Sequence, residues 1–398
     1  MKDVRLRVLL ILPNLYVGGT QEAVRTLAKY LASDHCRPVV CSLFDGGPLW
    51  DDLVGQGTQV EVLSLPRHRF LAFPWFVADM VHNWRMLAKV IAEHQINIVQ
   101  TYLLGIEHFL VLALARTMGV PVVILNFRNE KFLPFRHGGR LKNQIHLLGY
   151  RLARRWASDY VAVSAETKEA MVRLLGLSEE KVTVVCNGVD VDRYPRPIDR
   201  DRVRHRLGFN SDAKLLITVG TLKTQKGHRY LIEAAIGVVQ QYPNTHFLFV
   251  GDGTLRPELQ AQTNALGLSD KIHFLGNRRD VSELLTASDL FVLPSLWEGM
   301  SMALLEAMAA AKPIVATAVS GTGQVMIHKE TGILVPPGDA AELARAIVEL
   351  LSDPARARDM GEAARRRVEA NFSMEKQTAE YLALYSHLLQ EELEGCRD

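Results

Sequence analysis

Two glutamates, Glu298 and Glu306, have the residue type and the spacing that most directly suggest chemistry in this chain. Glu306 lies within an apolar run that is expected to be helical, and the residues three and four positions away from it are methionine and alanine, which offer no opposite charge. A carboxylate on such a helix face is costly unless a ligand or another polar group meets it. Glu306 is therefore a candidate ligand-binding residue.

Glu298 stands just ahead of that helix. The free N–H groups and the positive dipole end of a helix N-terminus suit a phosphate. Glu306 would lie about 7 to 8 Å farther along the axis, at roughly 1.5 Å per residue, where a ribose beside a diphosphate would fall. We interpret the pair as a clamp for a nucleotide sugar; the alternative is two surface glutamates that flank a core helix. The further candidate binding residues of this helix start are Gly299, Met300, Ser301 and Met302.

The length of 398 residues favours two domains of roughly 200 residues each over a single core. A hydrophobic fraction of 48% and a charged fraction of 23% are typical of a soluble globular protein, and a net charge of +2 gives no overall attraction to nucleic acid. The four cysteines have neither Cys-x-x-Cys spacing nor paired histidines, so neither zinc nor a disulfide framework is expected, and a cytoplasmic location fits. The apolar run within residues 1–13 is too short for a signal peptide or a membrane span.

Short β-rich runs alternate with longer helical patterns along the whole chain. This alternation predicts parallel sheets covered by helices on both faces, arranged as two doubly wound domains in tandem. The boundary is expected within residues 190–199, which carry prolines and charge, and residues 375–393 predict an amphipathic C-terminal helix. The expected strands are residues 7–12, 38–43, 98–102, 120–125, 160–164, 182–186, 215–220, 246–251, 272–275, 290–294, 313–317 and 333–335.

Several ordered motifs in this chain resemble those of the retaining glycosyltransferases of family 4. They comprise residues 287–317, 332–339, 250–253, 274–276 and 187–190, together with Ser164, so the resemblance is strong over 160–375 and weaker in the first 150 residues. It implies an α/β GT-B fold of two Rossmann-like domains facing across a cleft. Residues 1–192 would bind the acceptor and 200–375 the nucleotide sugar, with the helix 376–398 packing back on the first domain.

Two loops match ligand-binding loops of that family. Gly18 and Gly19 form a glycine pair after the first strand, where backbone can approach a ligand; in the family this loop borders the donor diphosphate and the acceptor, and the alternative is a tight turn without a ligand. Lys226 matches the lysine that pairs with the donor diphosphate, since a compact ammonium suits the charge that grows on a leaving phosphate. Thr221 stands where the family usually has arginine, and Lys223 is a candidate substitute for that arginine.

Other positions depart from the family or complete its site. Gln324 stands where an acidic residue is common, and Arg128 with Asn129 follows the strand after which the family often has a catalytic histidine. Arg128 could meet phosphate or an anionic acceptor, or could simply cap the strand end. Arg278 is a further donor-binding candidate, whereas His108 is interpreted as a packed structural histidine.

The resemblance implies a metal-independent, retaining hexosyltransferase that uses a UDP-sugar or GDP-sugar and no other cofactor. Glu298 would hold donor hydroxyls near the anomeric carbon and Glu306 the ribose, while Lys226 and the helix N-terminus take the place of a metal. The acceptor would be a glycan or a lipid-linked sugar in cell-surface glycan, polysaccharide or glycolipid synthesis. A phosphorylase or epimerase of the same fold, and a non-catalytic nucleotide-sugar-binding homologue, remain alternatives. A nicotinamide dehydrogenase is disfavoured, because residues 251–253 lack the third glycine of the dinucleotide fingerprint.

A basic segment at residues 135–156 is interleaved with apolar residues, and aromatic residues cluster at 70–76. Both fit a surface that sits on anionic lipid at the cytoplasmic face of a membrane; the alternatives are a solvated helix face and core packing. Nucleic acid is not expected as a partner, because no recognised binding motif accompanies the charge. The basic residues of the proposed lipid surface are Arg136, Arg140, Lys142, Arg151, Arg154 and Arg155.

Overall fold

The computed structural model describes residues 5–65, 73–102, 106–128, 144, 147, 150–151, 154–194 and 199–395. The chain divides into two compact units, one formed by Met1–Cys186 with Met374–Asp398 and the other by Asn187–Ser373. The first unit thus ends at 186 and resumes at 374, where the sequence suggested 192 and 376. Asn129, Arg136, Arg140 and Lys142 lie outside the described residues, as do Phe70 and the side chain of His108.

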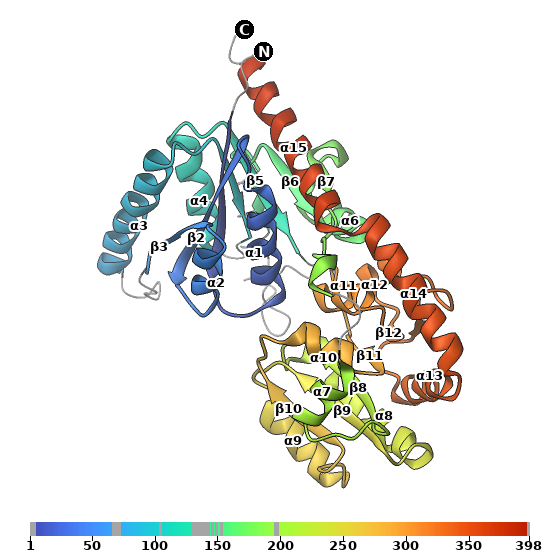
Figure 1. Cartoon of the computed structure of the whole chain (residues 1–398). Coiled ribbons are helices and arrows are strands. Elements are labelled where there is room, and N and C mark those ends of the chain that lie inside the picture. Colours follow the sequence, from blue (N-terminus) through green and yellow to red (C-terminus); the bar gives the residue numbers. More distant parts are fainter. Residues whose placement is uncertain are drawn as a thin grey trace. The chain divides into compact units, whose positions relative to one another are not determined.

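The first unit contains a sheet of seven parallel strands in the order β3-β2-β1-β4-β5-β6-β7 (Figure 1). Six of them confirm the expected strands of this half. The seventh, β3, was not expected, because it has only four residues at the sheet edge and two of them, Gln59 and Glu61, are polar. The strands are β1 (Leu6–Asn14), β2 (Cys36–Asp45), β3 (Gln59–Val62), β4 (Ile98–Thr101), β5 (Val122–Phe127), β6 (Asp159–Ala162) and β7 (Val182–Val184).

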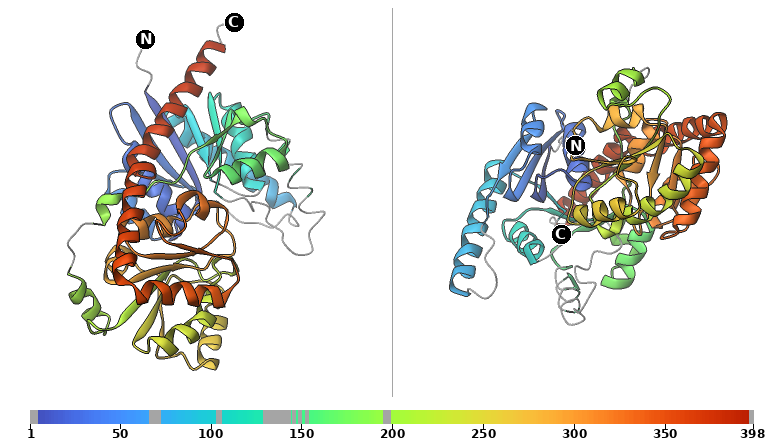
Figure 2. Two further views of the ribbon diagram at one scale, coloured as in Figure 1. Left: turned by 90° about the vertical axis from the view of Figure 1, so that its right-hand side faces the viewer. Right: turned by 90° about the horizontal axis from the view of Figure 1, so that it is seen from below.

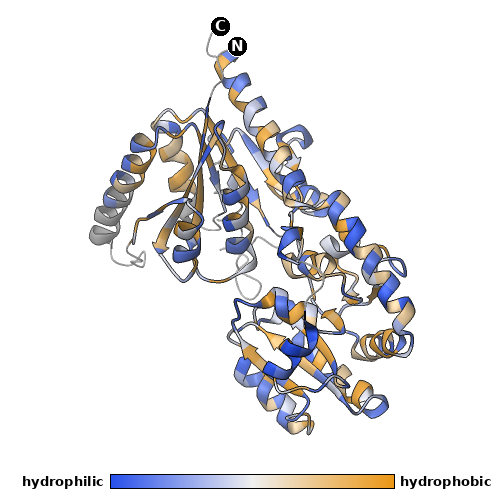
Figure 3. Ribbon diagram, in the orientation of Figure 1, coloured by the Kyte–Doolittle hydropathy of each residue, from blue (hydrophilic) through white to orange (hydrophobic). Residues whose placement is uncertain are grey.

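Successive residues of these strands face opposite sides of the sheet, and both sides are buried. Leu9 and Ile11 of β1 pack with α3, α4 and α6, whereas Leu10 and Leu12 pack with α1, α2 and α15. In Figure 3 the strands are largely orange, and many helices carry both blue and orange residues. The helices of the unit are α1 (Gly19–Leu31), α2 (Leu49–Gly55), α3 (Phe73–Glu93), α4 (Ile106–Thr117), α6 (Ala165–Leu175) and α15 (Met374–Gly395), with a 3-10 turn η1 (Glu179–Lys181).

The C-terminal helix α15 completes the first unit with two tyrosines that are fully buried, Tyr381 and Tyr385 (Figure 2, left). The Tyr385 hydroxyl donates to Gln100 Oε1 at 2.5 Å, and Asn126 Nδ2 donates to the Tyr381 hydroxyl at 2.7 Å. Because Gln100 and Asn126 lie in β4 and β5, a segment distant in sequence satisfies polar groups inside the sheet. The helix is therefore part of this core and not an appendage.

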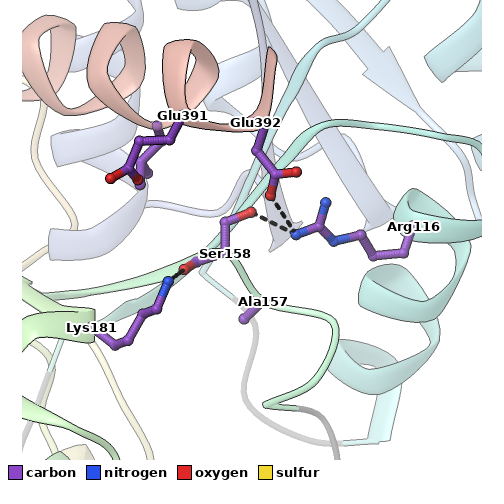
Figure 4. Close-up of a pocket in the computed structure, with 7 residues that line it drawn as sticks. Arg116, Ala157, Ser158, Lys181, Glu391 and Glu392 are labelled. Atoms are coloured by element: carbon purple, nitrogen blue, oxygen red, sulfur yellow. Dashed lines mark hydrogen bonds and ion pairs between the residues drawn. The ribbon is translucent and has the colours of Figure 1, made fainter. Parts of the chain in front are cut away.

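Near its C-terminus, α15 is held at the amino ends of the strands of the same sheet. A pocket of about 330 Å³ there is lined in part by Arg116, Ser158 and Glu392 (Figure 4). Arg116 Nη2 donates to Ser158 Oγ at 2.9 Å and to Glu392 at 3.1 Å, and its Nη1 donates to the Pro121 carbonyl at 2.6 Å. Pro121 and Ser158 directly precede β5 and β6, so this pocket lies at the amino ends of the strands. Ligands of parallel sheets bind at the carboxyl ends, and Arg116 is already paired, so the pocket serves to fasten α15.

The second unit contains a sheet of six parallel strands in the order β10-β9-β8-β11-β12-β13, as expected. The strands are β8 (Lys214–Val219), β9 (Thr245–Val250), β10 (Ile272–Gly276), β11 (Leu290–Leu293), β12 (Ile314–Thr317) and β13 (Ile333–Val335). The helices are α7 (Arg200–Arg206), α8 (His228–Gln241), α9 (Arg256–Ala265), α10 (Val281–Ala287), α11 (Met302–Ala309), α12 (Ser320–Val325), α13 (Ala340–Ser352) and α14 (Pro354–Asn371), with 3-10 turns η2 (Val191–Arg193) and η3 (Thr224–Lys226). Of the helices that the structure describes, none is both long and apolar enough to cross a membrane.

Local signals in the sequence explain several helix ends. Ser164 caps α6 by accepting a hydrogen bond from the Thr167 amide at 3.1 Å, and Gly176 ends that helix in the left-handed conformation with φ of 67°. Asp339 caps α13 in the same way, through the Glu342 amide at 2.9 Å. Such caps satisfy amides that have no partner within their own helix.

Replacement of Tyr385 by Phe should lower the free energy of unfolding by about 1–3 kcal/mol, because buried Gln100 loses the hydroxyl that donates to it. Ser386→Ala is the matched control, since this exposed hydroxyl donates only within its own helix, to the Leu382 carbonyl, and the expected change stays within about 0.5 kcal/mol. Urea unfolding at equal m-values would measure both changes. Equal effects of the two substitutions would contradict a structural role for the Tyr385 hydroxyl.

Candidate active site at the carboxyl edge of the second sheet

The strand order of the second sheet reverses between two neighbouring strands, β8 and β11. Strands β9 and β10 lie on one side of β8, whereas β11, β12 and β13 lie on its other side. In open parallel sheets, the crevice beyond the carboxyl ends of such a strand pair is where ligands bind. The segment after β8 carries Lys226 and the segment after β11 carries Glu298, so strand order brings together two residues that are 72 positions apart. This edge of the sheet is the candidate active site.

Lys226 and Glu298 form a buried ion pair. Lys226 Nζ lies 2.5 Å from Glu298 Oε1, and the Ser295 hydroxyl donates to the same oxygen at 2.7 Å. Gln225 Nε2 lies 3.3 Å from the other carboxylate oxygen, Oε2. The side chain of Glu298 is 6% exposed and that of Lys226 is 16% exposed, so both charges are largely removed from water. Each charge therefore depends on the other, because an unpaired buried charge costs about 3–5 kcal/mol.

The two loops that carry this pair are connected by hydrogen bonds from a backbone amide and from a side chain. The Leu296 amide donates to the Gln225 carbonyl at 2.7 Å, and Gln225 Nε2 donates to the Trp297 carbonyl at 3.0 Å. Gly227 has φ of 63°, and a Cβ placed on it would come within 1.9 Å of the Pro294 carbonyl oxygen. No residue other than glycine fits that approach, so the spacing between the two loops is fixed by a glycine.

The start of α11 is held by equally close contacts. Asn187 Nδ2 donates to the Met300 carbonyl at 3.0 Å, and a Cβ on Gly321 would lie 1.6 Å from the Gly299 carbonyl oxygen. Ser301 is the N-cap, with its hydroxyl accepting from the Leu304 amide at 3.4 Å. The residues predicted for a helix start that receives phosphate, Gly299 to Met302, thus form a packed turn directly after Glu298.

Gln225 and Ser295 are not singled out by sequence patterns, yet both hold Glu298. The signal available for them is position alone, since Gln225 directly precedes Lys226 and Ser295 precedes Glu298 by three residues. The Thr317 hydroxyl supports Ser295 in turn, donating to its carbonyl at 2.5 Å. Strands β8, β11 and β12 therefore all contribute to the position of one carboxylate.

His228 directly follows Lys226 and Gly227 and is a further unexpected component of the site. It is 2% exposed and packs against the Phe249 ring at 5.5 Å between centroids. Burial, together with the charge of Lys226, lowers the pKa of His228 to about 3. At neutral pH this imidazole is therefore uncharged.

The other residues predicted around this edge differ in their burial and in their hydrogen bonds with the rest of the protein. Glu306 is half-buried on α11 and takes part in an interaction with another group of the protein, so its assignment to a ligand stays a prediction. Arg278 donates to both carboxylate oxygens of Asp280 at 2.8 and 2.7 Å, and these hydrogen bonds raise the pKa of Arg278. Thr221 accepts the Lys223 amide at 2.7 Å through its carbonyl, and Lys223 itself is exposed.

Gln324 lies in α12 beside this edge, and Arg367 holds its backbone. Arg367 Nη2 donates to the Gln324 carbonyl at 3.1 Å and Arg367 Nε donates to the Val325 carbonyl at 2.6 Å. Within the described ranges no group of three or more His, Cys, Asp or Glu side chains could hold a metal ion.

The first unit places three predicted residues at the carboxyl edge of its own sheet. Gly18 is the N-cap of α1 and Gly19 its first residue, in the connection that follows β1, with no side chain of the described residues capping the helix. Arg128 directly follows β5 and is half-buried, and its guanidinium carbon lies 6.0 Å from the centre of the Tyr102 ring. Burial lowers the pKa of Arg128 below its ordinary value.

Two solved structures share this architecture. HepE of Anabaena in complex with UDP-glucose matches with a TM-score of 0.80 and 23% identity, covering 95% of this chain and 100% of HepE. Sucrose-phosphate synthase of Thermosynechococcus elongatus matches with a TM-score of 0.78 and 21% identity, covering 97% of this chain and 100% of the synthase. These matches confirm the expected GT-B fold of two Rossmann-like α/β domains.

Family profiles and sequence relatives match both halves of the chain. The profile described as Glycosyltransferase Family 4 matches residues 17–193, and that described as Glycosyl transferases group 1 matches residues 199–367. A galactosyltransferase of Escherichia coli, named for transfer from UDP-Gal to α-D-GlcNAc-diphosphoundecaprenol, is 29% identical over 78% of this chain and 79% of its own length. EpsD of Bacillus subtilis, named as a glycosyltransferase, is 30% identical over 313 residues, or 76% of this chain and 80% of EpsD. This chain therefore belongs to glycosyltransferase family 4, the group 1 glycosyl transferases, and is an enzyme that transfers a sugar from a nucleotide-sugar donor.

Proposed function

We propose that this glycosyltransferase transfers a hexosyl group from a UDP-sugar or GDP-sugar to a hydroxyl of a glycan or lipid-linked acceptor. The transfer proceeds with retention of the anomeric configuration and without a divalent cation. The observation that carries the proposal is the buried pair of Lys226 and Glu298 at the strand reversal of the second sheet. A fixed cation and a fixed carboxylate at that edge match the two ends of a sugar diphosphate.

In this mechanism Lys226 meets the diphosphate, and its charge stabilises the leaving group as the bond between the anomeric carbon and the phosphate oxygen breaks. An ammonium has three N–H donors, so Lys226 can keep Glu298 and still donate to phosphate oxygens. The N-terminus of α11, at Gly299 to Met302, adds a positive dipole end. The acceptor hydroxyl attacks the anomeric carbon on the face from which the diphosphate departs, and passes its proton to the departing phosphate oxygen. Attack on that face gives retention.

Glu298 then has two tasks in this mechanism. Its carboxylate holds Lys226 in place, and it accepts hydrogen bonds from donor hydroxyls close to the anomeric carbon. Ser295 and Gln225 keep the carboxylate oriented through hydrogen bonds to its two oxygens. The ribose is assigned to Glu306. The other residues proposed to line the donor site are Gly18, Gly19, Thr221 and Arg278, with Arg128 proposed as a catalytic residue of the first domain.

Relatives support a UDP-sugar ahead of a GDP-sugar. The Escherichia coli relative is named for a UDP-Gal donor and a diphosphoundecaprenol acceptor, and the HepE structure contains UDP-glucose. We therefore place this enzyme in the synthesis of a polysaccharide, surface glycan or glycolipid in the cytoplasm. Peripheral attachment to an anionic membrane stays a prediction from the charge of residues 135–156, and salt-sensitive co-sedimentation with anionic but not neutral vesicles tests it.

Glu298→Gln should lower turnover at least a hundredfold, about 2.7 kcal/mol of barrier, because the amide no longer neutralises Lys226 or holds donor hydroxyls as a charged acceptor. Lys226→Ala should lose at least as much, and the double variant little more than either single one, since the two act as a unit. Lys223→Ala is the matched control, an exposed lysine three residues before Lys226, and should stay within about twofold.

Release of UDP or GDP from a panel of sugar nucleotides would measure these rates, with melting curves to verify that each variant folds. Near-normal turnover of Glu298→Gln would contradict its assignment, and loss of activity in Lys223→Ala alone would transfer the phosphate contact to Lys223. Formation of a sugar 1-phosphate or of an epimer would instead identify a phosphorylase or an epimerase. Binding of the sugar nucleotide without any release would identify a non-catalytic homologue.

Free UDP should stabilise the enzyme in the presence of EDTA, because the protein's own cation meets the diphosphate. At about one hundred times its dissociation constant, the nucleotide contributes roughly 2.7 kcal/mol to the free energy of unfolding. Thermal melting with UDP plus EDTA, and with UDP plus magnesium, would measure this effect, and Lys226→Ala should abolish most of it. A stabilisation that requires magnesium would overturn the metal-free mechanism.

A further inference from the structure

Arg128 is an unusual cation in the first unit because of what surrounds it. It follows β5, and Tyr102 follows the neighbouring strand β4, so the side chains leave adjacent strand ends on the same edge of the sheet. The guanidinium carbon lies 6.0 Å from the Tyr102 ring centre, the geometry of a cation–π contact. Arg128 is half-buried and Tyr102 is 6% exposed. A charged side chain is thus held against a buried aromatic face.

No carboxylate among the residues that the structure describes forms an ion pair with Arg128. Two other half-buried arginines are paired with carboxylates: Arg116 with Glu392 at 3.1 Å, and Arg278 with Asp280 at 2.7 Å. Withdrawal from water without a neighbouring carboxylate lowers the pKa of Arg128, although guanidinium stays charged in proteins. The π face of Tyr102 compensates part of the hydration that the guanidinium has lost, and a bound anion would compensate the rest.

The ring that supports Arg128 is itself fixed by the C-terminal helix. Gln100 Nε2 donates to the Tyr102 hydroxyl at 2.6 Å, and Gln100 Oε1 in turn accepts from Tyr385 of α15. Tyr381 packs against Tyr385 with 5.6 Å between ring centroids and accepts from Asn126 at 2.7 Å. Every polar contact in this chain of residues is buried, so the platform under Arg128 is rigid.

We propose that Arg128 binds an anionic group of the acceptor, a phosphate or a carboxylate, and that acceptors with such a group are the substrate class of this enzyme. The inference rests on the proposed transfer reaction. The planar fork of a guanidinium suits bidentate binding of phosphate and carboxylate better than an ammonium does. The donor diphosphate has its own cation, Lys226, in the second unit. The same chemistry could come from the donor, and the experiment below separates the two sources.

Inorganic phosphate is the probe, titrated at constant ionic strength into the full-length protein with saturating UDP present, and followed by thermal melting. The wild type should be stabilised by phosphate on top of UDP, with Arg128→Gln weakening the phosphate affinity at least tenfold and Arg128→Lys weakening it less. Arg173→Gln is the matched control, because Arg173 is an exposed arginine of the same unit, in the last turn of α6. It should leave phosphate binding unchanged.

The inference would be overturned by phosphate binding that disappears once UDP is present, which assigns Arg128 to the donor diphosphate, or by equal loss in the Arg128 and Arg173 variants. A loss of UDP affinity in Arg128→Gln would likewise assign Arg128 to the donor diphosphate. The underlying proposal fails separately, since a wild type that binds no UDP contradicts the transfer reaction. Intact UDP binding without any phosphate binding contradicts the acceptor site alone.

Discussion

The ion pair between Lys226 and Glu298 is the interaction on which the rest of the second unit depends. Two opposite charges are stable away from water only when they touch and when hydrogen bonds satisfy their remaining capacity. Ser295 and Gln225 supply those bonds, and Gly227 permits the loops to approach closely enough for them to form. The strand reversal between β8 and β11 brings the loops together in the first place. The ion pair therefore connects loop spacing, glycine position and the choice of the surrounding side chains.

The first unit stabilises its cation, Arg128, by a different interaction. Arg128 rests on the ring of Tyr102, and a network of tyrosine and amide groups from β4, β5 and α15 keeps that ring in place. A cation held by an aromatic face keeps more of its capacity for an anion than one that touches a carboxylate. The two units thus offer two unlike cations, one compact ammonium beside a carboxylate and one planar guanidinium over a ring. That difference is the reason to assign them to different ligands.

Much of the fold and part of the site follow from sequence patterns. Buried apolar runs alternating with helical patterns predicted two parallel sheets and twelve of their strands, because strands buried on both faces carry a strong apolar signal. Strand β3 was missed, because an edge strand with alternating polar residues lacks that signal. The motif around Glu298, with the other ordered motifs, indicated the family, and that resemblance singled out Glu298 and Lys226 as candidates before any geometry was known.

Sequence alone determined which residues carry charge, which helix faces are apolar and where glycine interrupts the chain. Tertiary structure alone decided that Lys226 meets Glu298 across 72 residues, that Gln225 and Ser295 hold this pair, and that Tyr381 and Tyr385 support the platform under Arg128. The physical reason is that periodicity reports which side of a strand or helix is buried, whereas partners are set by the order of strands in the sheet. Hydrogen bonds between distant segments exist only once that order has formed.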